Sequence, residues 1–311
     1  MNKVNTIEIE LLRNNHVESK HKIQITNDRD TDGFEFFPRS AIKPFQIIPL
    51  LDLASKNNLI FDKEEIAIFA SSHSGQEEHV KLLTKIAKKY DIQWDQIFCA
   101  PQRPMHIQTA DHYISKKVPF SKLNNNCSGK HLSMLIYSKL LGIDNNNYHK
   151  IDHHIQQNIN KFFKEIFELG EIKYGIDGCG LPAIYLNSYS FLQGVKNVLN
   201  SDYKNLWLSI FESYNKFPNL VGGENRTDTN IMLNSFSPLL AKSGAEGVLF
   251  VTNNETSYLF KCIDGNFRAV DLVATNVLNK HKYINELPYT KLVENYSKNL
   301  QSTEVYSFNI I

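Results

Sequence analysis

The sequence predicts a mixed α/β (α+β) protein in which both ends of the chain contribute strands to one antiparallel sheet and the middle forms a helical lobe. Apolar residues alternate in strand fashion up to about residue 25 and again over residues 247–262, whereas helical spacing dominates between them. No Pro- or Ser-rich linker divides the chain. We therefore expect a single domain over residues 1–311, with a sheet lobe from about 1–80 and 240–311 and a helix-rich lobe from about 80–240.

The N-terminal part of the chain is expected to form strands followed by helices. Alternating apolar residues predict strands up to residue 25, and a turn-rich segment follows. From Ser40 the apolar residues recur at helical spacing, and Pro44 lies in the first turn, where its missing N–H is tolerated. The short apolar run 65–70 predicts a buried strand. An amphipathic helix should then cover about residues 77–90.

Helix ends in the middle of the chain carry recognisable signals. Ser74 and Glu77 have the S-x-x-E spacing of a capping box, so capping is the favoured role of Ser74. A later helix contains the apolar run 132–141 and stops at Gly142, as a helix C-terminus should. A long polar helix is expected around residues 148–169.

The C-terminal third predicts strands again. Alternation indicates strands over residues 247–251 and 258–262, and the Asp-Gly pair at 264–265 indicates a hairpin turn. A helix is expected over residues 269–281, and a polar tail follows it.

Composition and charge exclude several classes of protein. The 311 residues are 42% hydrophobic and 22% charged, as in an ordinary globular chain. Thirty-four Lys and Arg residues against thirty-three Asp and Glu residues give a net charge of +1, which argues against broad nucleic-acid or anionic-membrane binding. No glycine-rich phosphate loop is present, which removes kinase and dinucleotide-binding functions. Because no apolar signal segment or membrane-spanning stretch is visible, we expect a cytoplasmic protein.

The four cysteines show no disulfide framework, which fits a reducing compartment. Cys99 and Cys262 stand beside apolar residues and are interpreted as inert core thiols. Cys127 follows three asparagines at a predicted helix N-terminus, where a thiol pKa is lowered, and is a candidate nucleophile or metal ligand. Cys179 lies between two glycines, which allow a backbone or a ligand to approach closely.

Ser40 and Lys43 form a candidate catalytic pair. They are three residues apart at a helix start, so both side chains lie on one face. There a desolvated neutral lysine can take the hydroxyl proton, and the helix N-terminus favours developing negative charge. The S-x-x-K spacing alone is weak, since Ser19, Ser201 and Ser213 share it in polar segments. Flanking aromatic and proline residues single out Ser40.

A second lysine motif precedes the strand predicted at residues 247–251. Lys242-Ser243-Gly244 resembles the K-[ST]-G triad that serine β-lactamases and penicillin-binding proteins place on the strand facing their S-x-x-K helix. The alternative is a surface lysine before a glycine turn. The predicted cap at Ser74 leaves Ser72 without an assigned role.

Five motifs occur in a fixed order along the chain. They are PRSAIKPFQ at 38–46, SHSG at 72–75, CSGKH at 127–131, DGCGLP at 177–182 and KSGAEG at 242–247. Together they resemble the rhizobial-type L-asparaginases, also called the asparaginase II family, over about residues 30–270. The resemblance implies hydrolysis of L-asparagine to L-aspartate and ammonia, a fold similar to serine β-lactamases and glutaminases, and a homodimer.

The resemblance also implies roles for individual residues. It implies two catalytic Ser-Lys tandems, Ser40 with Lys43 and Ser72 with Lys242. It implies a zinc site with the ligands Cys127, Lys130 and Cys179, oriented by Asp177, in which the metal helps substrate binding more than hydrolysis. The candidate substrate contacts are Arg39, His131 and Asp177. Asp228 stands where some relatives have cysteine.

The resulting hypothesis is a two-step acyl transfer on L-asparagine. Ser40, activated by neutral Lys43, attacks the amide carbon and expels ammonia, and water then hydrolyses the acyl-enzyme. Ser72 and Lys242 relay protons, and the roles of the two serines are open to exchange. The alternatives are a glutaminase, a penicillin-interacting acylase or β-lactamase of the same fold, and a non-catalytic zinc-binding regulatory protein. The missing signal peptide argues against the acylase, and the retained lysines argue against the regulatory protein.

Overall fold

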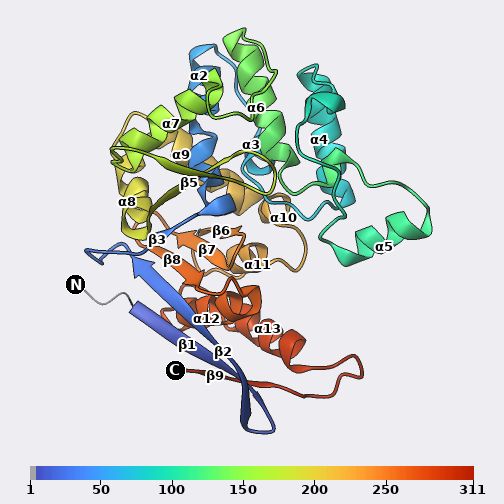
Figure 1. Ribbon diagram of the computed structural model, residues 1–311, viewed down its shortest axis with the longest axis vertical. Coiled ribbons are helices and arrows are strands. Elements are labelled where there is room, and N and C mark those ends of the chain that lie inside the picture. The colour runs from blue at the N-terminus through green and yellow to red at the C-terminus, as the bar shows by residue number, and fades with distance from the viewer. Residues whose placement is uncertain (1–4) are drawn as a thin grey trace.

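The computed structural model describes residues 5–311 and confirms the mixed α and β class (Figure 1). Within these residues the largest sheet has six strands in the order β6-β7-β8-β2-β1-β9, and all neighbours are antiparallel. The strands are β1 Asn5–Arg13, β2 His16–Asn27, β6 Leu240–Gly244, β7 Val248–Thr252, β8 Ser257–Cys262 and β9 Ser307–Ile310. Both ends of the chain therefore contribute to one sheet, as the alternation predicts.

The N-terminal hairpin follows from its alternating sequence and from its turn. Ile9 and Ile23 are buried on the core face of the sheet. Asn14 and Asn15 have φ values of 47° and 63°, left-handed values that suit a tight hairpin turn. The strand β2 then pairs with β8, with Ile23 opposite Cys262. This pairing joins segments from opposite ends of the chain.

Helices occupy the middle of the chain and also cover the sheet. They are α1 Lys43–Gln46, α2 Ile48–Lys56, α3 Lys63–Phe69, α4 Glu77–Lys89, α5 Ile107–Ser115, α6 Ser128–Leu141, α7 His154–Ile166, α8 Ser188–Leu199, α9 Lys204–Lys216, α10 Pro218–Val221, α11 Thr227–Leu233, α12 Phe267–Lys280 and α13 Leu287–Ser297. In Figure 1, α2, α4, α6 and α7 lie at one end of the molecule and the sheet lies towards the other, with α12 beside it. None of the helices in residues 5–311 has the length and apolar character needed to cross a membrane.

Shorter elements connect the two parts. The 3-10 helices are η1 Arg39–Ile42, η2 Trp94–Gln96 and η3 Lys122–Asn124. A small antiparallel sheet has the order β3-β5-β4, with β3 at Glu35–Phe36, β4 at Lys173–Ile176 and β5 at Pro182–Asn187. Ser40 lies in η1, which runs directly into α1, so the predicted helix start is present but begins as a 3-10 turn.

An aromatic cluster holds η1 and α1 against the rest of the molecule. The ring of Phe45 in α1 stacks on Trp207 of α9 with centroids 4.7 Å apart. It also meets Phe191 of α8 edge-on at 5.6 Å and lies 6.3 Å from Phe250 of β7. All four side chains are buried. Because each such pair adds about 0.5–1.5 kcal/mol beyond the area it buries, the turn preceding Phe45 has a fixed position.

The expectation of a buried strand at residues 65–70 is wrong, because residues 65–69 belong to α3 and Ala70 is its C-cap. The N-cap of α3 is Asp62, whose backbone N–H donates to Glu65 Oε2 at 2.9 Å in a capping box. The helix packs against α6, α9 and α10, so apolar residues surround it on most sides. Periodicity cannot separate a short buried helix of this kind from a buried strand.

Two helix starts also differ from the expectations. Ser74 does not cap α4, because its Oγ donates to the Gly222 carbonyl oxygen at 2.7 Å and the cap is Gln76. The long helix expected around residues 148–169 is confined to α7, His154–Ile166. Ser74 is held by this tertiary contact, whereas the polar residues before α7 form turns of their own.

The C-terminal third contains more regular structure than the sequence indicates. The turn at 264–265 leads into α12 and does not form a hairpin. The hairpins instead join β6 to β7 and β7 to β8. The expected polar tail contains α13 and β9, and β9 pairs with β1 so that Ile310 lies opposite Ile9.

The N-terminus of α6 lies directly against α3, and a glycine makes this approach possible. A Cβ added to Gly129 would lie 2.0 Å from the carbonyl oxygen of Ile68. Any larger residue must separate the two helices at the point where α6 begins.

We predict that Gly129→Ala destabilises the protein by about 1–3 kcal/mol or more, because the added methyl group overpacks the helix contact. Gly170→Ala is the matched control, since its Cβ would meet no atom within 4 Å. This control should change the free energy of unfolding by less than about 0.5 kcal/mol. Urea denaturation measures both, and equal effects would contradict the packing argument.

Candidate active site

Two backbone segments that are far apart in sequence meet closely at this site. η1 carries Ser40, and β6 carries Lys242. A Cβ added to Gly244 would lie 2.5 Å from the Pro38 carbonyl oxygen, so only glycine allows β6 to lie this close to η1. The S-x-x-K and K-S-G motifs are therefore neighbours in space.

Lys43 is completely buried beneath the site. Its Nζ donates to Ser72 Oγ at 2.9 Å and to the Ser71 carbonyl oxygen at 2.5 Å, and it lies 3.4 Å from Cys127 Sγ. Burial lowers the pKa of Lys43, and the nearby Cys127 opposes this effect. Lys43 is thus hydrogen-bonded to Ser72, whereas the Ser40 hydroxyl makes no hydrogen bond within the part of the chain that the structure describes.

Lys242 is the second fully buried lysine. Its Nζ donates to the Ser243 carbonyl oxygen at 2.8 Å, rather than to Ser72, and lies 3.6 Å from Asp228 Oδ2. Burial lowers the pKa of Lys242 to about 7, while Asp228 acts to raise it and Lys43 acts to lower it. A large fraction of this lysine is therefore neutral near neutral pH.

Asp228 is a site residue to which sequence reasoning gave no role. It is fully buried, and its Oδ2 accepts a hydrogen bond from the Ser243 backbone N–H at 3.1 Å. Burial acts to raise the pKa of Asp228, but the charges of Lys242 and Arg226 outweigh it and lower the pKa. In sequence, Asp228 is an acid in the first turn of α11, an ordinary place for an acid, and this conceals its contact with Lys242.

A pocket of about 340 Å³ lies above the two lysines. Six of the predicted site residues line it, namely Arg39, Ser40, Ser72, Cys127, Asp177 and Cys179. Lys43, Lys130 and Lys242 lie behind these residues and are buried. The structure therefore brings the two serines, the two cysteines and the lysines into one region.

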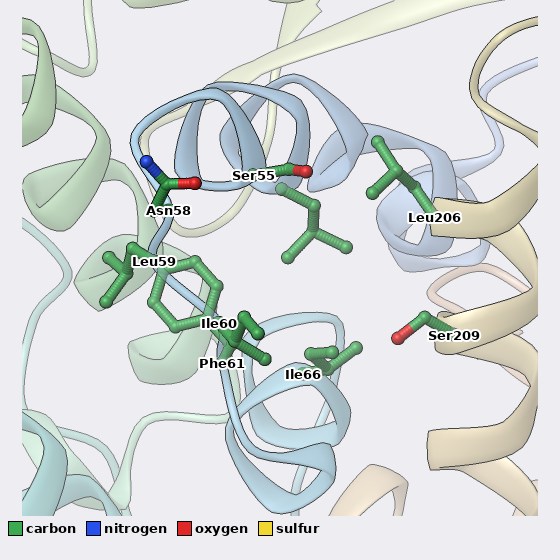
Figure 2. Close-up of a pocket in the computed structure, with 9 residues that line it drawn as sticks. Ser55, Asn58, Leu59, Ile60, Phe61, Ile66, Leu206 and Ser209 are labelled. Atoms are coloured by element: carbon green, nitrogen blue, oxygen red, sulfur yellow. The ribbon is translucent and has the colours of Figure 1, made fainter.

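A second hollow of about 380 Å³ lies between α2, α3 and α9 (Figure 2). Its wall is mainly apolar, with Leu59, Phe61 and Ile66 among the lining residues and only hydroxyl and amide groups as polar side-chain atoms. No titratable side chain lines it. It offers no acid, base or strong nucleophile, so the pocket over the lysines is the candidate active site.

Cys127 and Cys179 bring two thiols together at the edge of this pocket. Both are free cysteines, and their side chains hydrogen-bond to each other. That hydrogen bond lowers the pKa of Cys127, and the charges of Lys43 and Lys130 lower it further. The same hydrogen bond, together with burial, raises the pKa of Cys179.

Lys130 completes a group of donors that fits a zinc ion. Its side chain is buried beside the cysteines; burial acts to lower its pKa, but the charges of Cys179, Cys127 and Asp177 outweigh this and raise it. Two sulfurs and a nitrogen are donor types that zinc prefers. A bound ion would replace the protons that these groups now share.

Arg39 and Asp177 form a tight pair at the pocket wall. Nε and Nη2 of Arg39 both donate to Asp177 Oδ1, at 3.0 and 2.8 Å, and the Gly178 N–H donates to the same oxygen at 2.7 Å. Burial acts to raise the pKa of Asp177, but Lys130 and Arg39 outweigh it and lower the pKa. Arg39 has a φ of 51°, a strained value for a residue other than glycine.

Two further residues differ in their access to the pocket. Arg226, which sequence reasoning did not assign, lines it. Its Nη1 contacts Met105 Sδ at 3.4 Å, and within residues 5–311 it makes no ion pair. His131, a candidate substrate contact, is fully buried, and its Nδ1 bonds to the Tyr148 hydroxyl at 2.6 Å. The structure does not place His131 in the pocket wall.

A family model described as L-asparaginase II matches residues 9–307 of the sequence. The chain belongs to the L-asparaginase II family. This confirms the resemblance carried by the five motifs. The family consists of asparaginase-type amidohydrolases, so the substrate of this family member is a small molecule.

Other comparisons add less about this L-asparaginase II family member. A solved structure described as a putative beta-lactamase from Bacteroides dorei is 10% identical and covers 89% of this chain and 94% of its own, with a TM-score of 0.40. A score this low does not establish a common fold. A search of curated proteins finds no match.

Proposed function

We propose that this protein hydrolyses the side-chain amide of L-asparagine to L-aspartate and ammonia through an acyl-enzyme on serine. The observation that carries the proposal is the meeting of two serines with two fully buried lysines of lowered pKa at one pocket. Neutral lysine is a base strong enough to take a serine proton, and burial supplies the neutral form.

Ser40 is the proposed nucleophile because its hydroxyl lines the pocket without a hydrogen bond among the described residues. Its oxygen forms a bond to the amide carbon while the proton passes to Lys43, which lies one turn further on. Ser72, already bonded to Lys43 Nζ, can carry this proton between them. The C–N bond then breaks, ammonia leaves with a proton, and water hydrolyses the ester and restores Ser40.

Lys242 and Asp228 support the opposite wall of the pocket. Lys242 accepts or returns a proton during hydrolysis of the ester, since its pKa of about 7 matches both tasks near neutral pH. The Asp228 carboxylate lies 3.6 Å from Lys242 Nζ, and its negative charge stabilises the protonated form of this lysine. The pair therefore sets the pH range of the reaction in this proposal.

The substrate's charged groups find partners in the same wall. Arg226 is the proposed contact for the α-carboxylate, since its guanidinium makes no ion pair within the described residues. Asp177 is the proposed contact for the α-ammonium group, and Arg39 holds this carboxylate in place with two hydrogen bonds. Opposite charges in one small pocket suit a zwitterionic amino acid.

We further propose that Cys127, Lys130 and Cys179 hold a zinc ion. The two thiols and the buried amine adjoin the wall that would contact the substrate's charged groups. Bound there, the ion would act as a Lewis acid beside the pocket for an oxygen atom of the substrate, because its charge is balanced by the two thiolates. The residues named above perform the acyl transfer itself.

The serine assignment predicts that Ser40→Ala lowers ammonia release from asparagine by roughly a thousandfold or more, since the nucleophile is removed. Ser138→Ala is the matched control, because Ser138 is a buried serine with an unpartnered hydroxyl in α6 and does not line the pocket. Mass spectrometry of rapidly quenched enzyme should show the acyl group on Ser40. Near-normal turnover in Ser40→Ala, or an acyl group on Ser72, would overturn the assignment. Glutamine as a parallel substrate tests the choice of amide.

The pKa of Lys242 predicts the pH dependence of activity. Below about pH 7 Lys242 becomes protonated, so kcat/KM should fall on the acid side with a midpoint near 7. Asp228 raises this pKa, whereas Lys43 and Arg226 lower it. Asp228→Asn should therefore move the acid limb to lower pH, and the exposed Asp111→Asn should leave it unchanged. An acid limb that stays in place or rises in Asp228→Asn contradicts this role.

The zinc proposal predicts a change in metal content. Cys127→Ser and Cys179→Ser should each contain one equivalent less zinc than the unmodified protein after dialysis, as measured by elemental analysis. Cys99→Ser is the control, since Cys99 is buried and does not line the pocket. Equal zinc in all four proteins would exclude this site.

A further inference from the structure

Three side chains with metal-binding groups converge at the end of β8, outside the pocket. They are His21 of β2, Cys262 at the end of β8 and Asp264 in the turn that follows. One nitrogen, one sulfur and one oxygen of these residues all lie within 4.8 Å of one another. Among residues 5–311, these are the three His, Cys, Asp or Glu side chains whose possible metal-binding atoms come this close together.

The pairing of β2 with β8 produces this convergence. Ile23 lies opposite Cys262, so continuing the antiparallel register places His21 opposite Asp264. The N–H of Ile263 donates to the Lys22 carbonyl oxygen at 2.9 Å, which extends the ladder beyond the strand. Alternate residues of a strand share a face, so the three side chains project together.

The Asp264 carboxylate links the other two groups. Its Oδ2 lies 2.6 Å from His21 Nδ1, and its Oδ1 accepts a hydrogen bond from the Cys262 thiol at 2.9 Å. The second ring nitrogen of His21 contacts Ser19 Oγ at 3.3 Å. Metal-binding histidines commonly have an oxygen partner on the ring nitrogen that does not bind the metal, and Ser19 stands in that position.

The charges around the group suit a cation that displaces protons. Burial raises the pKa of Cys262 to about 12, with a further contribution from Asp264. Burial also acts to raise the pKa of Asp264, but the hydrogen bonds from Cys262 and His21 lower it to about 2. Glu246 adds a second acid, because its Oε2 lies 2.6 Å from where a Cβ of Gly265 would be. Lys261 opposes these acids, although its Nζ is held by the carbonyl oxygens of Glu246 and Cys262.

Solvent reaches the group mainly at Asp264. Cys262 is fully buried, whereas half of the Asp264 side chain and 12% of the His21 side chain are exposed. An ion can therefore enter past the carboxylate and reach the sulfur. A mixed set of imidazole, thiolate and carboxylate favours zinc and related transition metals over magnesium or calcium, which prefer oxygen ligands alone.

We propose that His21, Cys262 and Asp264 form a second binding site for a divalent transition metal, with zinc or cobalt as the bound ion. Three protein ligands leave one position for water. The site joins β2 to the turn before α12. Two residues near the site connect it to the pocket: Glu246 directly follows the lining residue Ala245, and Phe267 itself lines the pocket. A bound ion would therefore fasten β2 to the turn that leads to the pocket residue Phe267.

Cobalt titration of the full chain under reducing conditions tests this site. The experiment uses the Cys127→Ser/Cys179→Ser protein, in which the other pair of thiols is absent. Cobalt should produce the near-ultraviolet absorption of a cobalt–thiolate bond, bind with one equivalent, and raise the melting temperature. His21→Gln and Cys262→Ser, added to this protein, should each abolish the absorption and the rise in melting temperature.

His16→Gln is the matched control, because His16 is an exposed histidine on the same strand and is absent from the group. It should leave the cobalt absorption unchanged. Circular dichroism without metal establishes that each variant is folded. A folded Cys127→Ser/Cys179→Ser protein without thiolate absorption would overturn the proposal, as would absorption that survives His21→Gln. Neither result depends on asparaginase activity.

Discussion

The constraint on which the site depends is the burial of two lysine ammonium groups in one small region. Lys43 and Lys242 have no exposed surface, and the charge of Lys43 contributes to lowering the pKa of Lys242. A shift of the Lys242 pKa from 10.5 to about 7 corresponds to roughly 5 kcal/mol in favour of the neutral form. This penalty opposes folding in full below about pH 7 and is lost as the pH rises towards 10.5, so the surrounding packing must hold the side chain in place.

Close backbone packing provides that support. The aromatic rings around Phe45 fix the start of α1, and Gly244 allows β6 to press against η1. The charge on Lys43 meets Cys127, and the charge on Lys242 meets Asp228. Each lysine thus has one acidic partner and backbone oxygens, an arrangement that limits the free-energy penalty of burial without removing the lowered pKa.

Much of the site could be predicted because its residues stand in short, distinctive motifs. Ser40, Ser72, Cys127 and Cys179 each belong to such a motif and line one pocket. The partners of the lysines could not be predicted in the same way. Spacing places Ser40 beside Lys43 on one turn, but the direction of the Lys43 side chain depends on α3 and α6, and it points to Ser72.

The errors in the fold have a similar physical origin. The strands β1, β2, β7 and β8 were anticipated from their apolar residues, whereas β6 and the C-terminal β9 were not. Most of the run 65–70 lies in a helix that other helices enclose. Its apolar residues therefore face several sides and show no helical periodicity. Asp228 and Arg226 were missed because polar residues at the start of a helix are common, and only tertiary contacts turn them toward the pocket.

The strand order has a consequence for synthesis of the chain. The β1–β2 hairpin leaves the ribosome early, yet its two outer edges are covered by β8 and β9, which are made last. Until then the hairpin presents unpaired N–H and C=O groups on both sides, the condition under which strands of different chains associate. Nascent molecules are therefore exposed to aggregation for most of translation, and the two edges close only when the C-terminal third has been made.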